Sequence, residues 1–215
     1  MKPADHSLLD RWRNRYMGKT LFVLGTGPSL KEVTEPQWAQ LTQRPCFVSN
    51  EFYLARPGFV PTFWGVSETE VVDRVEGPTR GCDCLKVFSS PVDKNDGFMY
   101  RNPGWTWLYR DSFSPMSWGY FEGFKAPLDY VADGDSPHLT IGLQLGVWMG
   151  FREFVLVGID NSQDGYVFDR GWRRSAKVVN SVIAHQSAAF DVLTAHGIPM
   201  WDCSPVSKTK VPKKL

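Results

Sequence analysis

A chain of 215 residues fits a single domain over residues 1–215, since one hydrophobic core commonly serves chains of up to about 250 residues. The composition, 42% hydrophobic and 22% charged, excludes an intrinsically disordered chain. The net charge of +1 excludes the behaviour of a bulk polycation toward nucleic acid.

Both ends of the chain are nevertheless basic. Residues 1–19 hold five basic side chains against two acidic ones, and residues 206–215 hold four lysines and no acid. The stretch between them is therefore acidic. The basic ends either steer a polyanionic acceptor or are ordinary solvated charges, and we expect residues 206–215 to form a frayed, basic tail.

Neither the cysteines nor the apolar runs indicate secretion. The four cysteines, Cys46, Cys82, Cys84 and Cys203, lack the C-x-x-C spacing of a zinc site and the density of a disulfide scaffold. The first residues, MKPADHSLLDRW, contain no apolar signal segment, and no apolar run approaches about 18 residues. We therefore expect a cytoplasmic protein without a transmembrane segment.

Short apolar runs alternate with amphipathic stretches along the chain. The first run, residues 21–24, ends at a glycine and is typical of a buried parallel strand. Similar runs follow at residues 46–49, 62–66, 85–89, 154–158 and 198–202. Helical periodicity is found over residues 7–16, 36–42, 67–75, 139–150 and 178–196. This order predicts an α/β fold with a Rossmann-like, mostly parallel sheet flanked by helices.

Residues 94–136 differ from the rest, because they are dense in Gly, Pro and aromatic residues and show no clean period. The sequence predicts an irregular, aromatic-rich insertion here, which is either a packed lid over the site or a connector. Its Trp and Tyr side chains are candidates for acceptor recognition, since aromatic rings stack on sugars and bases.

A turn of small residues follows the first predicted strand. It consists of Gly25, Thr26, Gly27, Pro28 and Ser29. Such a turn either brings backbone N–H groups close to a phosphate or is a structural tight turn. Ser29 and Glu32 have the spacing of a capping box, which predicts a helix start. The turn matches neither the G-x-G-x-x-G pattern nor a Walker loop.

Polar residues also follow the ends of other predicted strands. They are Asn50 after the second strand, Glu68 after the third, and Asp160 after the strand FVLVGID. The carboxyl ends of parallel strands share one edge of the sheet, so we expect these residues to converge on one crevice.

The segments GTGPSL (residues 25–30), SNEFYL (49–54) and HLTIGLQLGVWMGFREFVLVGID (138–160) resemble a superfamily that shares a G-x-GPSL turn. Its members include bacterial sialyltransferases of glycosyltransferase family forty-two, motility-associated flagellin glycosylation proteins and archaeal-type 6-hydroxymethylpterin diphosphokinases. The resemblance lapses in the aromatic insertion. It implies a nucleotide-type fold and a substrate that carries phosphates.

The resemblance implies nucleotide contacts at four positions. Thr26 stands where the sialyltransferases have an Asn, and it retains one hydroxyl hydrogen bond. Asn50 matches a second nucleotide-side Asn, although an Asn in this position is also a common turn former. Thr140 and Gly142 match the T-x-G opening of a helix that faces the site.

Two further positions depart from the sialyltransferase pattern. His138 replaces an Arg and lacks its bidentate fork, so the donor need not be CMP-sialic acid. Tyr166 matches a tyrosine that stabilises the leaving phosphate, whereas Ser162 replaces the second one. Glu68, His138 and Ser162 are candidate contacts to the donor or acceptor.

Asp160 and His185 complete the candidate catalytic residues with Tyr166. The Asp160 carboxylate orients a sugar hydroxyl, coordinates magnesium or caps a turn. His185 is a candidate base, because an imidazole accepts protons near neutral pH; the alternative is a core histidine.

These residues predict a glycosyltransferase that uses a nucleotide sugar, inverts the anomeric centre and requires no cofactor. The acceptor is a glycan, a glycolipid or a nucleic acid, and a homo-oligomer is compatible with the sequence. Two alternatives stay open: a pterin-type pyrophosphokinase that uses ATP and magnesium, and a nucleotide-binding module without catalysis.

Overall fold

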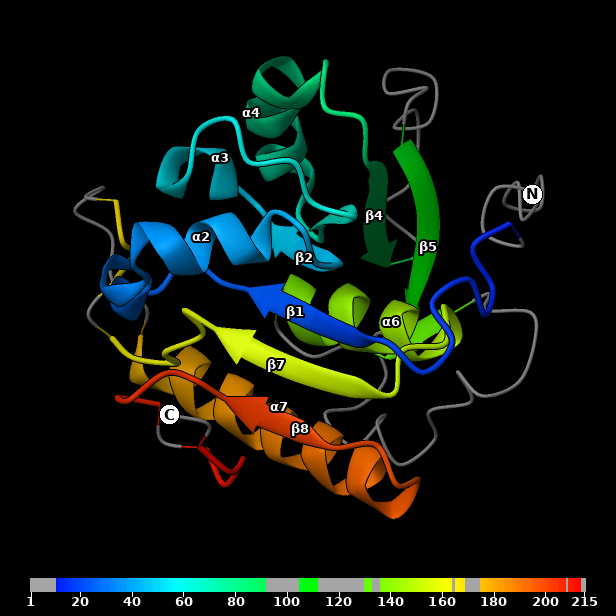
Figure 1. Ribbon diagram of the computed structural model, residues 1–215, viewed down its shortest axis with the longest axis vertical. Helices are drawn as coiled ribbons and strands as arrows, with labels where there is room; N and C mark the ends of the chain where they lie inside the picture. The colour runs from blue at the N-terminus through cyan, green and yellow to red at the C-terminus, as the bar shows by residue number, and fades with distance from the viewer. Residues whose placement is uncertain are drawn as a thin grey trace.

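A computed structural model describes residues 11–91, 105–111, 130–132, 136–163, 165–168, 175–207 and 209–213. Within these residues the strands form one 8-stranded sheet in the order β6-β5-β4-β3-β2-β1-β7-β8. Every neighbouring pair in this sheet is parallel. The predicted α/β, Rossmann-like fold is therefore confirmed (Figure 1).

The six predicted strands are present in the predicted order, and β5, β6 and α3 are additional elements. The strands are β1 (Thr20–Leu24), β2 (Cys46–Ser49), β3 (Phe63–Val66), β4 (Leu85–Pro91), β5 (Trp105–Asp111), β6 (Tyr130–Ala132), β7 (Glu153–Val157) and β8 (Met200–Asp202). The helices are the 3₁₀ helix η1 (Pro28–Glu32), α2 (Glu35–Leu41), α3 (Phe52–Ala55), α4 (Thr69–Thr79), the π-helix η4 (His138–Leu143), α6 (Gln144–Trp148) and α7 (Ala176–Ala195).

The sheet is covered on both faces, because its strands alternate their side chains between two apolar cores. Val23, Phe47 and Phe63 belong to the core that η4, α6 and α7 cover. The residues that follow them in β2 and β3, Val48 and Trp64, belong to the opposite core with α2, α3 and α4. Figure 1 shows α6 and α7 behind the strands and α2 on the near side.

The chain order creates a topological switch point between β1 and β7. From β1 the chain moves outward through β2 to β6, and it then returns to pair β7 with the other side of β1. Connections that leave neighbouring strands in opposite directions open a crevice at the carboxyl ends of those strands. The fold therefore places a crevice after residues 24 and 157.

The capping box predicted at Ser29 is wrong. The helix η1 has no side-chain cap, and the Ser29 hydroxyl instead donates to Asp160. A capping box forms a few residues later, between Thr34 and Gln37 at the start of α2. The Ser29 hydroxyl does not cap the helix because it donates to the Asp160 carboxylate, and a hydrogen bond to a charged acceptor is stronger than one to a neutral group.

The insertion at residues 94–136 is less irregular than predicted. It contributes β5 and β6, which extend the parallel sheet beyond β4. The segment WTWLYRD of β5 mixes aromatic, polar and charged residues, so it lacks the continuous apolar run by which the other strands were recognised. Most of the remaining insertion lies outside the described residues, and so does the predicted lid.

The helix predicted over residues 7–16 does not extend into the described residues 11–18, which form turns. Tyr16 stacks on Phe151 with ring centroids 4.8 Å apart, and the Tyr16 N–H donates to the Met149 carbonyl at 2.9 Å. Because this segment leads into β1, it lies at the amino end of that strand, opposite the crevice. The arginines at positions 11, 13 and 15 therefore do not border the crevice.

The C-terminal segment is also better ordered than predicted. Val211 is 2% exposed and joins the main core. The Lys213 ammonium lies 3.1 Å from the fully buried Asp202 carboxylate and donates to the carbonyls of Ser204 and Ser207 at 2.6 and 3.1 Å. The prediction of a frayed tail is therefore wrong for residues 209–213, because a distant buried carboxylate holds them.

Candidate functional site

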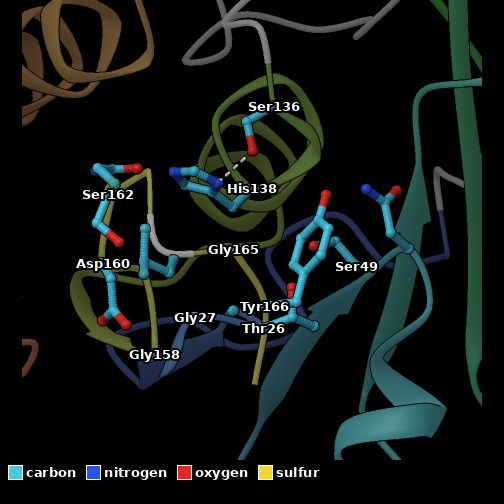
Figure 2. Close-up of a pocket in the computed structure, with 14 residues that line it drawn as sticks. Thr26, Gly27, Ser49, Ser136, His138, Gly158, Asp160, Ser162, Gly165 and Tyr166 are labelled. Atoms are coloured by element: carbon cyan, nitrogen blue, oxygen red, sulfur yellow. Dashed lines mark hydrogen bonds between the residues drawn. The ribbon is translucent and has the colours of Figure 1, made fainter. Parts of the chain in front are cut away.

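A pocket occupies the crevice at the carboxyl ends of β1, β2 and β7 (Figure 2). The turns after these strands and the start of η4 supply its walls. The described residues that line it are Gly25, Thr26, Gly27, Ser49, Asn50, Ser136, His138, Gly158, Ile159, Asp160, Asn161, Ser162, Gly165 and Tyr166. The predicted convergence of strand ends is therefore confirmed for Asn50 and Asp160 but not for Glu68, which lies outside this lining.

The turn after β1 lies directly against the turn after β7. The N–H groups of Gly25 and Gly27 donate to the carbonyls of Val157 and Gly158, each at 2.8 Å. A Cβ at Gly25 would lie 2.3 Å from the Gly158 oxygen, which no side chain tolerates. The close approach of the two turns therefore explains why glycine is required here. The N–H groups that the sequence suggested for a phosphate already donate to backbone carbonyls.

The Asp160 carboxylate joins three turns. It accepts hydrogen bonds from the Ser29 N–H at 2.8 Å, from the Ser29 hydroxyl, and from the Ser204 hydroxyl at 2.5 Å. Asp160 is 3% exposed. Of the three interpretations of this residue, the turn cap fits these contacts, because the carboxylate oxygens already accept three hydrogen bonds.

Two asparagines that line the pocket have buried side-chain oxygens. Asn50 and Asn161 follow β2 and β7 with φ of 50° and 48°, in the left-handed region that Asn tolerates. Among the described residues, neither side-chain oxygen has a hydrogen-bond partner. A buried acceptor without a partner costs about 1–3 kcal/mol, so a ligand donor at either oxygen is favoured. The sequence did not single out Asn161 as a ligand contact, although it follows the G-x-D strand end.

A chain of hydrogen bonds runs behind the pocket wall. The Ser136 hydroxyl lies 2.6 Å from His138 Nδ1, and His138 Nε2 lies 3.3 Å from Gln186 Oε1. The same Gln186 oxygen accepts a hydrogen bond from Asn161 Nδ2 at 2.8 Å. Ser136 and His138 line the pocket, whereas Gln186 lies fully buried on α7. The sequence pointed to His138 but not to Ser136 or Gln186.

Six predicted site residues lie outside this lining. They are Pro28, Ser29, Glu68, Thr140, Gly142 and His185. Thr140 is fully buried in η4, and Glu68 is exposed at the start of α4. A Cβ at Gly142 would lie 2.7 Å from the Phe47 ring, so Gly142 lets η4 pack closely on β2. His185 is buried on α7, one residue before Gln186.

The described lining is nearly free of formal charge. It contains neither lysine nor arginine, and Asp160 is its one carboxylate. Hydroxyl, amide and imidazole groups dominate, and these groups recognise hydroxyl and amine donors of a ligand. In the described part of the chain, no three His, Cys, Asp or Glu side chains are grouped to hold a metal ion. None of the helices described there is both long and apolar enough to cross a membrane.

No family model matches the chain, and no curated protein matches it. Among solved structures, the chain is similar to MAf glycosyltransferase from Magnetospirillum magneticum AMB-1, with a TM-score of 0.60 and 14% identity. That match covers 96% of this chain and 37% of the glycosyltransferase, so this chain spans little more than a third of it. A second match is the sialyltransferase CstII from Campylobacter jejuni in complex with the substrate analogue CMP-3FNeuAc. Its TM-score is 0.49 at 14% identity, over 88% of this chain and 83% of that one.

These similarities concern the fold. At 14% identity, the match to MAf glycosyltransferase establishes a shared α/β architecture, which the resemblance in the sequence implied. The diphosphokinase part of that resemblance receives no support from them.

Proposed function

We propose that the protein is a glycosyltransferase that moves a sugar from a nucleotide-sugar donor to an acceptor hydroxyl, with inversion and without a metal. The observation that carries the proposal is the pocket at the β1/β7 switch point, whose lining includes Asn50 and Asn161, two residues whose side-chain oxygens have no hydrogen-bond partner among the described residues. Ribose hydroxyls and the amino group of a pyrimidine base are such donors. The fold shared with a glycosyltransferase supports the same assignment.

The proposed roles follow from the positions in the pocket. Thr26 and Asn50 contact the nucleotide, and Tyr166 and Ser162 donate to the leaving phosphate as its charge develops. Tyr166 lies across the pocket from Asp160 and Ser162 (Figure 2). His138, which lines the pocket, rather than His185, which does not, is the imidazole that borders the reacting groups.

The acceptor approaches this pocket rather than the basic N-terminal segment, which lies at the opposite end of β1. A glycan or glycolipid hydroxyl fits the neutral lining, because its recognition needs no positive charge. Attack of that hydroxyl on the anomeric carbon breaks the bond to the leaving phosphate, and the acceptor proton passes to a base.

Thermal unfolding with CMP, UDP, GDP and ATP, each with and without magnesium, tests the proposal. We expect at least one pyrimidine nucleotide to stabilise the fold without magnesium, by about 2.7 kcal/mol at a ligand concentration of 100 times Kd. Stabilisation by ATP alone, and only with magnesium, would favour the pyrophosphokinase instead. Binding without hydrolysis or transfer of any nucleotide sugar would favour the non-catalytic module.

The variant Asn50→Gly tests whether Asn50 contacts the nucleotide or serves only to form the turn. Glycine adopts the φ of 50° at this position, so we expect the free energy of unfolding to change little. Loss of the buried amide is expected to weaken nucleotide binding about tenfold, or about 1.4 kcal/mol. Calorimetric titration with the nucleotide that stabilises the native protein measures this. Equal affinity of the variant and the native protein would leave Asn50 a turn former only.

A further inference from the structure

The hydrogen bonds around His138 fix which ring nitrogen carries the proton. Gln186 Oε1 is an amide oxygen and only accepts hydrogen bonds, so the neutral His138 ring must donate to it from Nε2. Gln186 is held in this orientation because its Oε1 also accepts from Asn161 and its Nε2 lies 3.5 Å from the Thr209 hydroxyl. His138 Nδ1 is then left as an acceptor.

The hydroxyl of Ser136 is the donor to that acceptor. It lies 2.6 Å from His138 Nδ1, a distance typical of a strong O–H···N hydrogen bond. Both ring nitrogens of His138 thus contact protein groups, whereas Ser136 itself lines the pocket. Figure 2 shows the Ser136 hydroxyl and the His138 ring joined at one wall of the pocket. The hydroxyl, imidazole and amide oxygen have the order found in nucleophile–base–orienter triads.

We propose that Ser136, His138 and Gln186 form a proton relay for the acceptor hydroxyl, an inference that rests on the proposed glycosyl transfer. Ser136 Oγ takes the proton of the acceptor hydroxyl while its own proton moves to His138 Nδ1. The acceptor oxygen bonds to the anomeric carbon, and the electron pair of the broken bond leaves with the donor phosphate. The imidazolium later releases its proton to solvent. Gln186 is a positioning residue, since it holds the ring and its tautomer through Nε2.

The relay differs from the base that the sequence suggested. His185 precedes Gln186 on α7 but does not line the pocket, so it has no place in the proton path. The other titratable side chains among the described lining residues are Asp160 and Tyr166. The Asp160 carboxylate accepts hydrogen bonds from Ser29 and Ser204, so it belongs to a different hydrogen-bond network from that of His138.

Nitrogen-15 spectra of the histidine rings test the geometry in the free protein. We expect His138, identified by its missing signal in His138→Gln, to be the Nε2–H tautomer. Gln186→Glu places a carboxylate at the Nε2 proton and should raise the pKa of His138 by about 1 to 2. Gln186→Met, of similar volume, should leave a mixture of tautomers. An Nδ1–H tautomer in the native protein would overturn the relay.

Hydrolysis of donor, with water as the acceptor, tests the function of the relay. CMP-sialic acid, UDP-N-acetylglucosamine and GDP-mannose serve as probes, and the released nucleotide is measured. Ser136→Ala should lower kcat by about 10²- to 10⁴-fold with unchanged nucleotide affinity, and Ser136→Thr should recover most of that loss. In Gln186→Glu the acid limb of the pH profile of kcat should shift to higher pH by the same amount as the pKa of His138 rises.

The outcomes separate the two proposals. If the native protein hydrolyses a probe but Ser136→Ala does so equally well, the relay fails and the glycosyltransferase stands. The same holds if the pKa of His138 rises in Gln186→Glu while the pH profile stays fixed. If the native protein neither binds nor hydrolyses any probe, the proposed function fails and the relay fails with it.

Discussion

Gly25→Ala is expected to lower the free energy of unfolding by about 2 to 3 kcal/mol and to abolish nucleotide binding. The added methyl group would lie 2.3 Å from the Gly158 carbonyl oxygen and 2.7 Å from the Ile159 side chain. Because the nearest atom belongs to the backbone, the turns after β1 and β7 must separate. That separation breaks the hydrogen bond from Gly25 to Val157 and deforms the pocket. Urea unfolding and nucleotide titration measure the two effects.

Gly81→Ala is the matched control. A Cβ at Gly81 has no atom within 4 Å, and its φ lies outside the left-handed region. The same methyl group should therefore change the free energy of unfolding by less than about 0.5 kcal/mol. If both variants are equally stable, the close contact between the two turns is not a constraint on the fold.

Lys213→Met is expected to lower the free energy of unfolding by about 2 kcal/mol, because it leaves a buried carboxylate without its cation. Asp202 is fully buried, whereas Lys213 keeps 35% exposure, so water offsets part of the loss. The substitution also removes the donor to the carbonyls of Ser204 and Ser207. Chemical unfolding monitored by tryptophan fluorescence measures the change.

Lys210→Met provides the comparison within the same segment. Lys210 pairs with Asp191, but the two side chains are 48% and 61% exposed. An exposed ion pair contributes about 0.2 to 1 kcal/mol, so this variant should stay close to the native protein. Equal losses in the two variants would mean that the general charge of the segment, not the contact with Asp202, stabilises it.

The parts of the fold that the sequence predicted are those with strong local patterns. Buried strands such as residues 21–24 and 46–49 are continuous apolar runs, and the long helix α7 has a clear period. The strands β5 and β6 were missed, because their place in the sheet depends on pairing with β4 rather than on their own composition. The docking of residues 209–213 was missed because it too depends on contacts with a distant segment, here with Asp202, rather than on local composition.

The candidate site divides in a similar way. Thr26 and Asn50, which closely follow strands, and Tyr166, in the loop after β7, were predicted and line the pocket. Ser136 and Gln186 were not, because a serine before a helix and a glutamine within one have no meaning until the fold joins positions 138 and 186. Hydrogen bonds between distant segments are the information that local periodicity lacks.

The contact of the C-terminal segment with β8 also closes one border of the sheet. β8 is the last strand in the sheet order, and its outer side receives the bridge between Asp202 and Lys213 and the hydrogen bond from the Asp202 N–H to the Pro212 carbonyl at 2.9 Å. An unpaired edge strand is a template for association with another chain, and charge or a covering segment suppresses it. Self-association by continuation of the sheet through β8 is therefore disfavoured.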